Sequence, residues 1–478
     1  MRYMETDMKK TIKRLFVITE LIFMIMVGAF YFLAGDQLTY KSTKHPIDLY
    51  DADSVSDELI IGRSISQDFV CQMDRIEQVG IVFTKFYREA KGTVTIELRE
   101  EEHLLFKQTF DMDEIPEQQR LFLRIVRPIR NQKGKKITLH IYGDSMEGSA
   151  AAIMMNQESA EGTIMTDGEV ARGSLCFSIN GSDEIWIGHY YWYLAAVLVT
   201  AMAILLYVSY KSYVNGRNNY LIRGILAVYK YSFLISQLVL RDFKSKYKRS
   251  ILGVFWSFLN PLMTMTVQFL VFSTFFTADT QNYPIYLLSG VVCFSFFSEC
   301  TTMCLSSISA NARLITKVYI PKYIFPLSRS ISSSINLAIS LVPLLLACLI
   351  LGVAIRPQAL LFFYFLACLI VFALGIGMFL SALMVFFRDI QFLWTVLTQI
   401  WMYATPIFYP AEIIPEKFKF IVRLNPLYHF IGNARTCLIN GISPEPSAYL
   451  YCFLFAMVSL IIGSYTFKKT QDRFALYL

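Results

Sequence analysis

The chain has 478 residues, of which 55% are hydrophobic and 15% aromatic, and its mean hydropathy is +0.45. A water-soluble fold of this length needs more polar surface, so an ordinary soluble enzyme is excluded. The net charge of +7 hides an asymmetry: residues 36–189 hold 17 Lys and Arg against 26 Asp and Glu, and the rest holds 27 against 11. Because the basic residues flank apolar runs, the excess does not indicate a nucleic-acid partner.

The first apolar run, at 15–34, is long enough to cross a bilayer, which takes about 20 apolar residues. It is preceded by a basic cluster: Lys9, Lys10, Lys13 and Arg14. A secretory signal peptide is the competing interpretation. We reject it because the run is long and no small-residue cleavage site follows. Residues 1–35 are therefore expected to form a cytoplasmic start and a first transmembrane helix.

Residues 36–188 follow a different pattern. Short alternating or β-branched segments are separated by Gly and charged turns, at 80–83, 93–98, 121–126 and 137–142. Such spacing is typical of an antiparallel, all-β sandwich of the jelly-roll kind, and about 150 residues can hold one core. Cys71 and Cys176 are the two cysteines here. A disulfide could join them if this domain lies outside the cytoplasm.

A second transmembrane helix is predicted within 189–211. Like the first, it carries its basic flank on one side, with Lys211, Arg217 and Arg223 after it. The positive-inside rule then places both chain termini in the cytoplasm and residues 36–188 on the extracytoplasmic side of the cell membrane.

Residues 212–250 are predicted to form a cytoplasmic linker and an amphipathic interface helix. Tyr231, Ile235, Leu238 and Val239 recur at helical spacing, and the end of the segment is basic. We expect the apolar face to contact lipid and the cations to face head groups. Those cations could also meet an anionic lipid-phosphate cargo at its point of uptake, or they could serve only as an anchor. The residues concerned are Arg241, Lys244, Lys246, Tyr247, Lys248 and Arg249.

Six further apolar runs lie in the domain 251–478, at 251–276, 285–308, 328–353, 359–386, 392–408 and 447–467. The fold class is thus an α-helical polytopic membrane protein of about eight transmembrane helices with an inserted β sandwich. Segment 411–442 is too polar to span, and we expect short re-entrant or interfacial helices there, on the outer face. Glu299 lies inside a predicted span, where it could act in function or pack as a protonated acid.

Aromatic residues gather along the seventh predicted span and its outer end. Trp394, Trp401, Tyr403 and Tyr409 could line a sugar path by stacking, or they could pack against protein and lipid, which we favour for most of them.

Several motifs occur in one order through the second half of the chain. They are RDFKSKYKRSILG at 241–253 with Trp256 and NP at 260–261, NARLITK at 311–317 with IP at 320–321 and FP at 325–326, FRDI at 387–390, TPIFYP at 405–410, and NP at 425–426. Together they resemble the ABC-2 type export permeases for polysaccharides and polyol phosphates, a group that includes O-antigen and wall teichoic acid exporters. The resemblance covers about residues 229–478.

The resemblance implies an export permease for a lipid-linked glycan of the undecaprenyl-diphosphate type, a polysaccharide or a teichoic acid. Its implied partners are a second copy of the chain, two copies of an ABC ATPase, the glycan substrate and membrane lipid. ATP and Mg would bind to the ATPase, because this chain lacks the G-x-x-x-x-G-K-[ST] phosphate loop, and no cofactor or metal is expected in it.

The resemblance also assigns two loops. The segment that carries Asn311, Arg313, Leu314, Lys317 and Pro321 is similar to the coupling helix that docks on the ATPase; an ordinary cytoplasmic loop is the alternative. Arg388 and Asp389 would be a structural pair near the ATPase side, or an anchor at a helix end.

The first half of the chain departs from the family pattern, because two spans and a sandwich are added. This carbohydrate-binding-like domain could contact the glycan, with Phe83, Phe86 and Tyr87 as candidates, or act as a spacer. The alternative function is a multi-span envelope glycosyltransferase or acyltransferase. Such an enzyme would need acidic or His residues clustered at one membrane face, and residues 229–478 contain few acids. A sensor is disfavoured by the six further spans.

Overall fold

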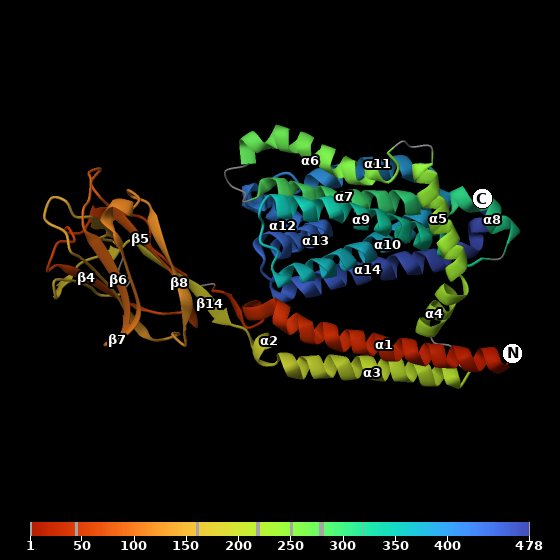
Figure 1. Ribbon diagram of the computed structural model, residues 1–478, viewed down its shortest axis with the longest axis horizontal. Helices are drawn as coiled ribbons and strands as arrows, with labels where there is room; N and C mark the ends of the chain where they lie inside the picture. Colours follow the sequence, from red (N-terminus) through yellow and green to blue (C-terminus); the bar gives the residue numbers. More distant parts are fainter. Residues whose placement is uncertain are drawn as a thin grey trace. The chain divides into compact units, whose positions relative to one another are not determined.

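The computed structural model describes residues 2–43, 46–158, 162–216, 220–248, 252–276, 282–318 and 320–477. The chain divides into two compact units (Figure 1). Residues 38–190 form the β unit, and residues 1–37 join residues 191–478 in the helical unit.

Two antiparallel sheets form the β unit, in the strand orders β1-β14-β5-β10-β13 and β12-β11-β4-β9-β6-β7. In the larger sheet β2 pairs with β14, β3 with β10, and β8 with β5. Its strands are β1 (Tyr40–Ser42), β2 (Ile47–Asp48), β3 (Ser54–Val55), β5 (Arg75–Thr84), β8 (Arg120–Arg130), β10 (Ala152–Asn156), β13 (Ser174–Leu175) and β14 (Phe177–Glu184). The smaller sheet holds β4 (Ser64–Val70), β6 (Thr93–Glu100), β7 (His103–Asp111), β9 (Lys136–Gly143), β11 (Ile164–Thr166) and β12 (Glu169–Ala171).

The alternation of the strands explains their packing. In β9, Ile137, Leu139 and Ile141 are fully buried, whereas the residues between them point to the opposite face. They share one apolar core with residues of the larger sheet such as Val79 and Ile81. The predicted all-β sandwich is confirmed.

One carboxylate on the other face of the smaller sheet is almost fully buried. Glu97 accepts hydrogen bonds from Arg99 Nε at 2.8 Å and Tyr142 Oη at 2.9 Å, and Lys107 Nζ lies 3.1 Å away. Burial alone would raise the pKa of Glu97, but the hydrogen bonds from Arg99, Lys107 and Tyr142 outweigh it and hold that pKa below its usual value. The charged carboxylate therefore ties β6, β7 and β9 together.

The two cysteines of the β unit are not bonded to each other. Cys71 and Cys176 are both free and buried, and the Cys71 thiol donates to the backbone oxygen of Met73 at 3.3 Å. The disulfide considered from the sequence is therefore absent. Burial raises the pKa of the Cys71 thiol and raises that of Cys176 to about 11.

Seven helices among the described residues are long and apolar enough to cross a membrane. They are α1 (Arg2–Ala34), α3 (Tyr191–Val214), α6 (Phe255–Phe276), α7 (Tyr283–Leu305), α9 (Ile324–Ile350), α10 (Phe362–Phe386) and α14 (Pro446–Thr470). Helices α7, α9, α10 and α14 share one buried core, while α1 and α3 pack against each other.

The seventh predicted span, at 392–408, is shorter than expected. Helix α11 (Ile390–Ala404) has 15 residues, a length of about 22 Å against a hydrocarbon core of about 30 Å. It ends because Pro406 disfavours helical geometry at the preceding residue, and Thr405 is extended.

Short elements complete the chain. They are α2 (Trp186–His189), α4 (Tyr220–Lys230), α5 (Ser232–Tyr247), α8 (Ala312–Lys317), α12 (Glu416–Leu424), α13 (Pro426–Arg435), α15 (Phe474–Tyr477), the 3-10 helices η1 (Gly35–Leu38), η2 (Met112–Glu114), η3 (Ser309–Asn311), η4 (Pro357–Leu361), η5 (Ala411–Ile413) and η7 (Gln471–Arg473), and the π-helix η6 (Thr436–Asn440). The short helices expected within 411–442 are thus present.

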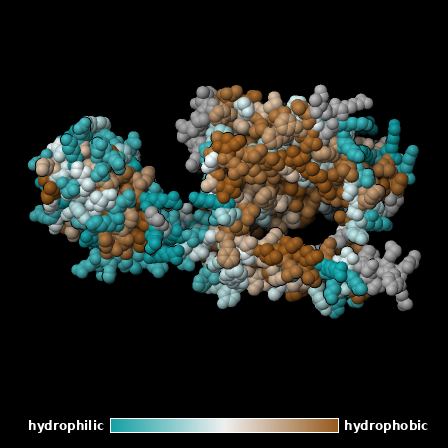
Figure 2. All heavy atoms as spheres, viewed as in Figure 1, coloured by the Kyte–Doolittle hydropathy of each residue, from teal (hydrophilic) through white to brown (hydrophobic). Residues whose placement is uncertain are grey.

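On the face shown in Figure 2, the helical unit is largely apolar and the β unit is mainly hydrophilic. Ile25, Leu270 and Ile350 are among the many large apolar side chains exposed on the helices. A monomeric soluble protein rarely leaves so wide an apolar surface uncovered. The helical unit therefore has the surface of a polytopic membrane protein.

Helix α5 packs differently from the prediction. Ile235, Leu238 and Val239 are buried in a cluster with Ile324 and Phe325 at the start of α9. The expectation that this apolar face contacts lipid is wrong, because the first turn of α9 and its neighbours cover it.

Candidate functional site

A cleft of about 490 Å³ opens beside α5, near the end of α7 and the start of α9. Cationic, anionic and polar side chains line it: Arg241, Asp242, Phe243, Ser245, Lys246, Glu299, Met303, Ala310, Arg329, Ser332 and Asn336. Charged side chains inside membrane helices mark functional sites by default, which makes this cleft the candidate site.

Three helices meet at one carboxylate in the cleft. Glu299 of α7 lies 2.7 Å from Lys246 Nζ of α5 and accepts a 2.8 Å hydrogen bond from Asn336 Nδ2 of α9. The side chains of Lys246 and Glu299 are 43% and 30% exposed, so solvent still reaches this pair. Glu299 is therefore a hydrogen-bonded group of the cleft wall that contacts both α5 and α9.

A second ion pair fixes α5 to α9. The side chain of Asp242 is only 4% exposed, and its carboxylate lies 3.0 Å from Arg329 Nη1 and 3.2 Å from Arg241 Nη2. Arg329 is itself mostly buried. A buried carboxylate is tolerated when paired in this way, so Asp242 sets the position of α5 on the bundle.

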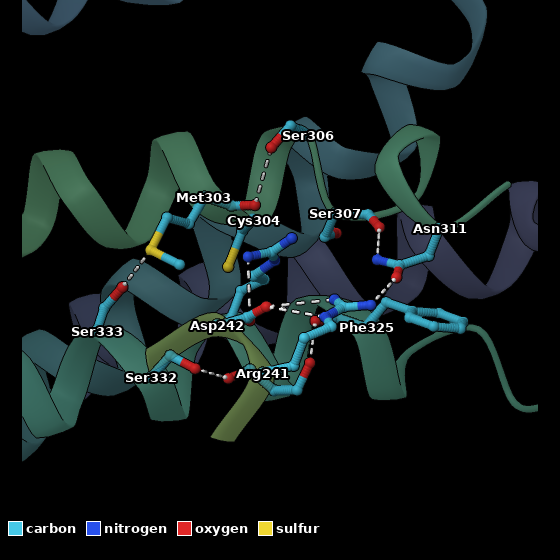
Figure 3. A network of polar contacts seen from close by, with 12 residues as sticks. Arg241, Asp242, Met303, Cys304, Ser306, Ser307, Asn311, Phe325, Ser332 and Ser333 are labelled. Atoms are coloured by element: carbon cyan, nitrogen blue, oxygen red, sulfur yellow. Dashed lines mark hydrogen bonds and ion pairs between the residues drawn. The ribbon is translucent and has the colours of Figure 1, made fainter. Parts of the chain in front are cut away.

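A third contact joins α5 to the segment that leads into α8. Arg241 Nη1 donates to Asn311 Oδ1 at 3.0 Å, and Asn311 Nδ2 donates to the backbone oxygen of Ser307 at 2.8 Å (Figure 3). Asn311 is buried at the end of η3. One amide thus links the basic helix to the loop after α7.

The predicted cations of α5 separate into two groups. Arg241 and Lys246 line the cleft, whereas Lys244 and Lys248 are exposed. Tyr247 is the last residue of α5. Arg249 lies outside the described residues.

Of the five residues predicted for ATPase coupling, Asn311 ends η3, and the other four lie on α8 and in the loop after it. Arg313 and Lys317 are exposed, so they are available to a partner. Leu314 is half-buried against the cluster that contains Phe325, and Pro321 is half-buried in the loop.

Arg388 and Asp389 are both exposed in the turn between α10 and α11. Among the ion pairs of the described residues, none joins these two side chains. The structure does not bring them into the cleft.

The predicted channel aromatics mostly pack within the protein. Trp394 is buried and donates to Thr301 Oγ1 at 3.2 Å, and Trp401 donates to Asn425 Oδ1 at 2.8 Å. Both indoles contact the ring of Phe297, with ring centroids 6.2 and 5.2 Å from it. Thr301 of α7 and Asn425, the N-cap of α13, therefore hold the two indoles in place.

Of the remaining two aromatics, Tyr403 is exposed and Tyr409 is half-buried. The Tyr409 hydroxyl donates to the Tyr403 backbone oxygen at 2.9 Å. In the β unit, Phe83 is fully buried and cannot contact a glycan, while Phe86 and Tyr87 are exposed in a turn where both have positive φ.

Sequence reasoning missed Asp242, Arg329 and Asn336 as site residues. Their signal was present, because each is a charged or amide residue inside or beside an apolar run. The sequence could not show which residues they contact, because those contacts depend on how α5 packs on α7 and α9.

The cleft offers two kinds of recognition. Guanidinium and ammonium groups from Arg241, Lys246 and Arg329 are the groups that bind phosphate in proteins. Glu299, Asn336 and Ser332 supply acceptors or mixed donors for hydroxyl groups. Within the described residues, no group of three or more His, Cys, Asp or Glu is arranged to hold a metal ion.

Comparisons with known proteins match about half of the chain. Residues 234–439 match the family model described as ABC-2 type transporter. The chain is 30% identical over 255 residues to the O-antigen export system permease protein RfbA of Klebsiella pneumoniae, covering 96% of that protein and 52% of this chain.

Two other relatives match at similar coverage. The protein of the same name from Myxococcus xanthus is 29% identical over 261 residues, covering 99% of its length and 53% of this chain. The polysialic acid transport protein KpsM of Escherichia coli is 23% identical over 245 residues, covering 93% of its length and 50% of this chain.

Proposed function

The chain belongs to the family of ABC-2 type transporter membrane domains, and from that premise we propose that it is the permease subunit of an exporter for a lipid-linked cell-envelope polysaccharide or teichoic acid. A separate ABC ATPase supplies the energy. Two copies of the chain and two copies of the ATPase form the transporter, which lies in the cytoplasmic membrane. ATP and Mg bind to the ATPase.

Support for the cargo class comes from the relatives and from the cleft. The relatives are named for export or transport of O-antigen and polysialic acid. The single observation that carries the proposal is the placement of Lys246 in a 490 Å³ cleft beside Glu299 and Asn336. A phosphate group on a lipid carrier is the anion that this ammonium would bind, and the apolar surface around the helices suits the lipid tail.

We further propose that the cleft exchanges partners when cargo arrives. The contact between Lys246 and Glu299 is partly open to solvent, so a phosphate can replace the carboxylate without a large desolvation penalty. Asp242 and Arg329 are more buried and keep α5 in place during the exchange. Uptake would then break the Lys246–Glu299 pair and leave the Asp242–Arg329 pair in place.

Coupling to the ATPase would pass through Asn311. Its amide bonds to Arg241 of the cleft and also to the backbone that leads into α8, whose Arg313 and Lys317 are exposed. Movement of α8 on a docked ATPase would therefore move Arg241. In this proposal the end of α7 at Leu305 faces the cytoplasm and the β unit lies outside.

The test is reconstitution with the ATPase in proteoliposomes, scoring transfer of a lipid-linked glycan. Lys246→Glu should abolish transfer because it places two carboxylates in contact and removes the phosphate-binding cation. The pair Lys468→Glu and Lys469→Glu, on exposed residues in the last turn of α14, is the matched control. Wild-type transfer by the Lys246→Glu variant would remove the cleft from the mechanism, and absence of ATPase-dependent transfer by the wild type would remove the function.

A further inference from the structure

Residues 405–410, here called the strap, cross from α11 to η5 without helical hydrogen bonding of their own. Ile407 and Phe408 in this strap are buried. An unpaired backbone carbonyl at membrane depth is strongly unfavourable, so each strap carbonyl needs a hydrogen-bond donor. Backbone N–H groups serve the oxygens of Thr405 and Pro410. Side chains of α7 and α13 serve the four oxygens between them.

Two tyrosines of α7 hold one side of the strap. Tyr283 Oη donates to the backbone oxygen of Phe408 at 2.7 Å. Tyr286 Oη lies 2.9 Å from the backbone oxygen of Tyr409 and 3.2 Å from that of Pro406. Both tyrosines lie in the first turns of α7, three residues apart and so on one face.

Arg435, at the end of α13, holds the other side. Its Nη1 donates to the Pro406 oxygen at 2.7 Å and its Nη2 to the Ile407 oxygen at 3.1 Å. Nη2 also donates to the Tyr286 oxygen at 2.9 Å, and Nε donates to Ser289 Oγ at 3.3 Å. The guanidinium carbon lies 3.5 Å from the centroid of the Tyr286 ring.

The site is built around this one cation. Arg435 is buried, and among the ion pairs of the described residues none contains it, so backbone oxygens, a hydroxyl and a ring solvate the charge. Gly290 makes the room: a Cβ there would lie 2.3 Å from Nη2 of Arg435. An uncharged, well-packed side chain at position 435 would stabilise the fold at a lower desolvation cost than a buried arginine.

We infer that Arg435 is a positioning residue that latches the strap, and that releasing it opens the end of the helical unit opposite the cleft. The inference rests on the proposed function, since a transporter needs an outlet there. Bonds from a side chain to strap carbonyls can break and reform while α7 and α13 stay helical. Removing the guanidinium leaves the oxygens of Pro406 and Ile407 short of donors, which favours a strap that swings out to water.

The experiment measures exposure of the strap in the full chain, reconstituted with its ATPase. An Ile407→Cys reporter is labelled with a membrane-impermeant maleimide; the nine native cysteines are buried and give little background. Adding Arg435→Gln should raise the labelling rate by about tenfold or more, as expected for loss of donors to buried acceptors. Arg435→Lys keeps the charge but loses the forked guanidinium, so its labelling rate should lie between that of the reporter alone and that of Arg435→Gln.

Arg423→Gln is the matched control, because this arginine is exposed on α12. If Arg435→Gln does not fold, Tyr286→Phe tests the same latch, since it removes only the hydroxyl that bonds to Pro406 and Tyr409. Faster labelling at residue 407 while Cys437 and Cys452 stay unreactive supports the latch. Equal labelling of reporter and buried cysteines would show general loosening, and that result would overturn it.

The latch and the transport function can fail separately. If both variants label at the rate of Arg423→Gln while the wild type exports glycan, the latch is wrong and the function stands. If labelling responds as expected but no ATPase-dependent transfer is found, the strap opens and the exporter assignment is wrong.

Discussion

Replacing Arg329 by methionine removes the main partner of a buried carboxylate. Asp242 would keep only Arg241, which is half exposed and 3.2 Å away, in place of the Arg329 contact at 3.0 Å. Breaking a buried pair by removing one partner costs about 3–5 kcal/mol. Because Arg241 remains, we expect the lower end, about 3 kcal/mol, for Arg329→Met.

The matched substitution Arg241→Met should cost less. Its ion pair is half exposed, worth about 1 kcal/mol or less, and its hydrogen bond to Asn311 adds about 1 kcal/mol. The double variant Asp242→Leu with Arg329→Met should recover most of the loss, because no uncompensated charge stays buried.

The assay is a double-mutant cycle on protein in detergent, reading the midpoint of denaturant unfolding for the wild type, both single variants and the pair. A coupling of about 2 kcal/mol or more between positions 242 and 329 is expected. If the two single changes simply add, Asp242 and Arg329 are not coupled and this pair does not fix α5 on the bundle. Transfer activity should fall with Arg329→Met even at temperatures where the variant is folded.

Three other outcomes check the orientation and the β unit. A cysteine at Lys317→Cys, exposed on α8, should react with impermeant maleimide only in inside-out vesicles; reaction in right-side-out vesicles would contradict the proposed sidedness. Cys71 and Cys176 should resist alkylation at pH 8, because they are buried and burial raises the pKa of Cys176 to about 11, and a reductant should leave the thermal midpoint unchanged. The folded pKa of Glu97 is lowered, so its stabilisation is present above the unfolded value of about 4.3 and is lost as pH falls through the folded pKa. Glu97→Gln should therefore flatten the acid limb of stability against pH in calorimetry, and identical limbs would count against the Glu97 cluster.

Much of the fold was predictable because two sequence patterns, strand alternation and the length of apolar runs, are simple. Strand alternation in 93–98 and 137–142 set the sandwich, and apolar length set the spans. The shortening of α11 also had a visible cause in Pro406, yet the apolar run continues past it to Phe408, and hydropathy alone follows the run.

The site was predictable only in part. The spacing of apolar residues predicts which face of a helix is apolar, but it does not predict what covers that face. The periodic residues of α5 do form one face, but Ile324 and Phe325 of α9 cover it in place of lipid. The role of Arg435 was also not predictable from the sequence. It lies in a polar segment where a basic residue attracts no notice, and its role comes from carbonyls nearly 30 residues earlier and from α7.

The polar groups of the helical unit are divided by how easily each can change partner. Asp242 and Arg329 are mostly buried and form an ion pair with each other. Lys246 and Glu299 are partly exposed to solvent, so their ion pair can exchange a partner more easily. At the strap, Arg435 bonds to neutral oxygens, which bind a guanidinium more weakly than a carboxylate does. This division fits the proposed transport cycle, in which α5 stays fixed while an anion binds in the cleft and the strap is released from Arg435.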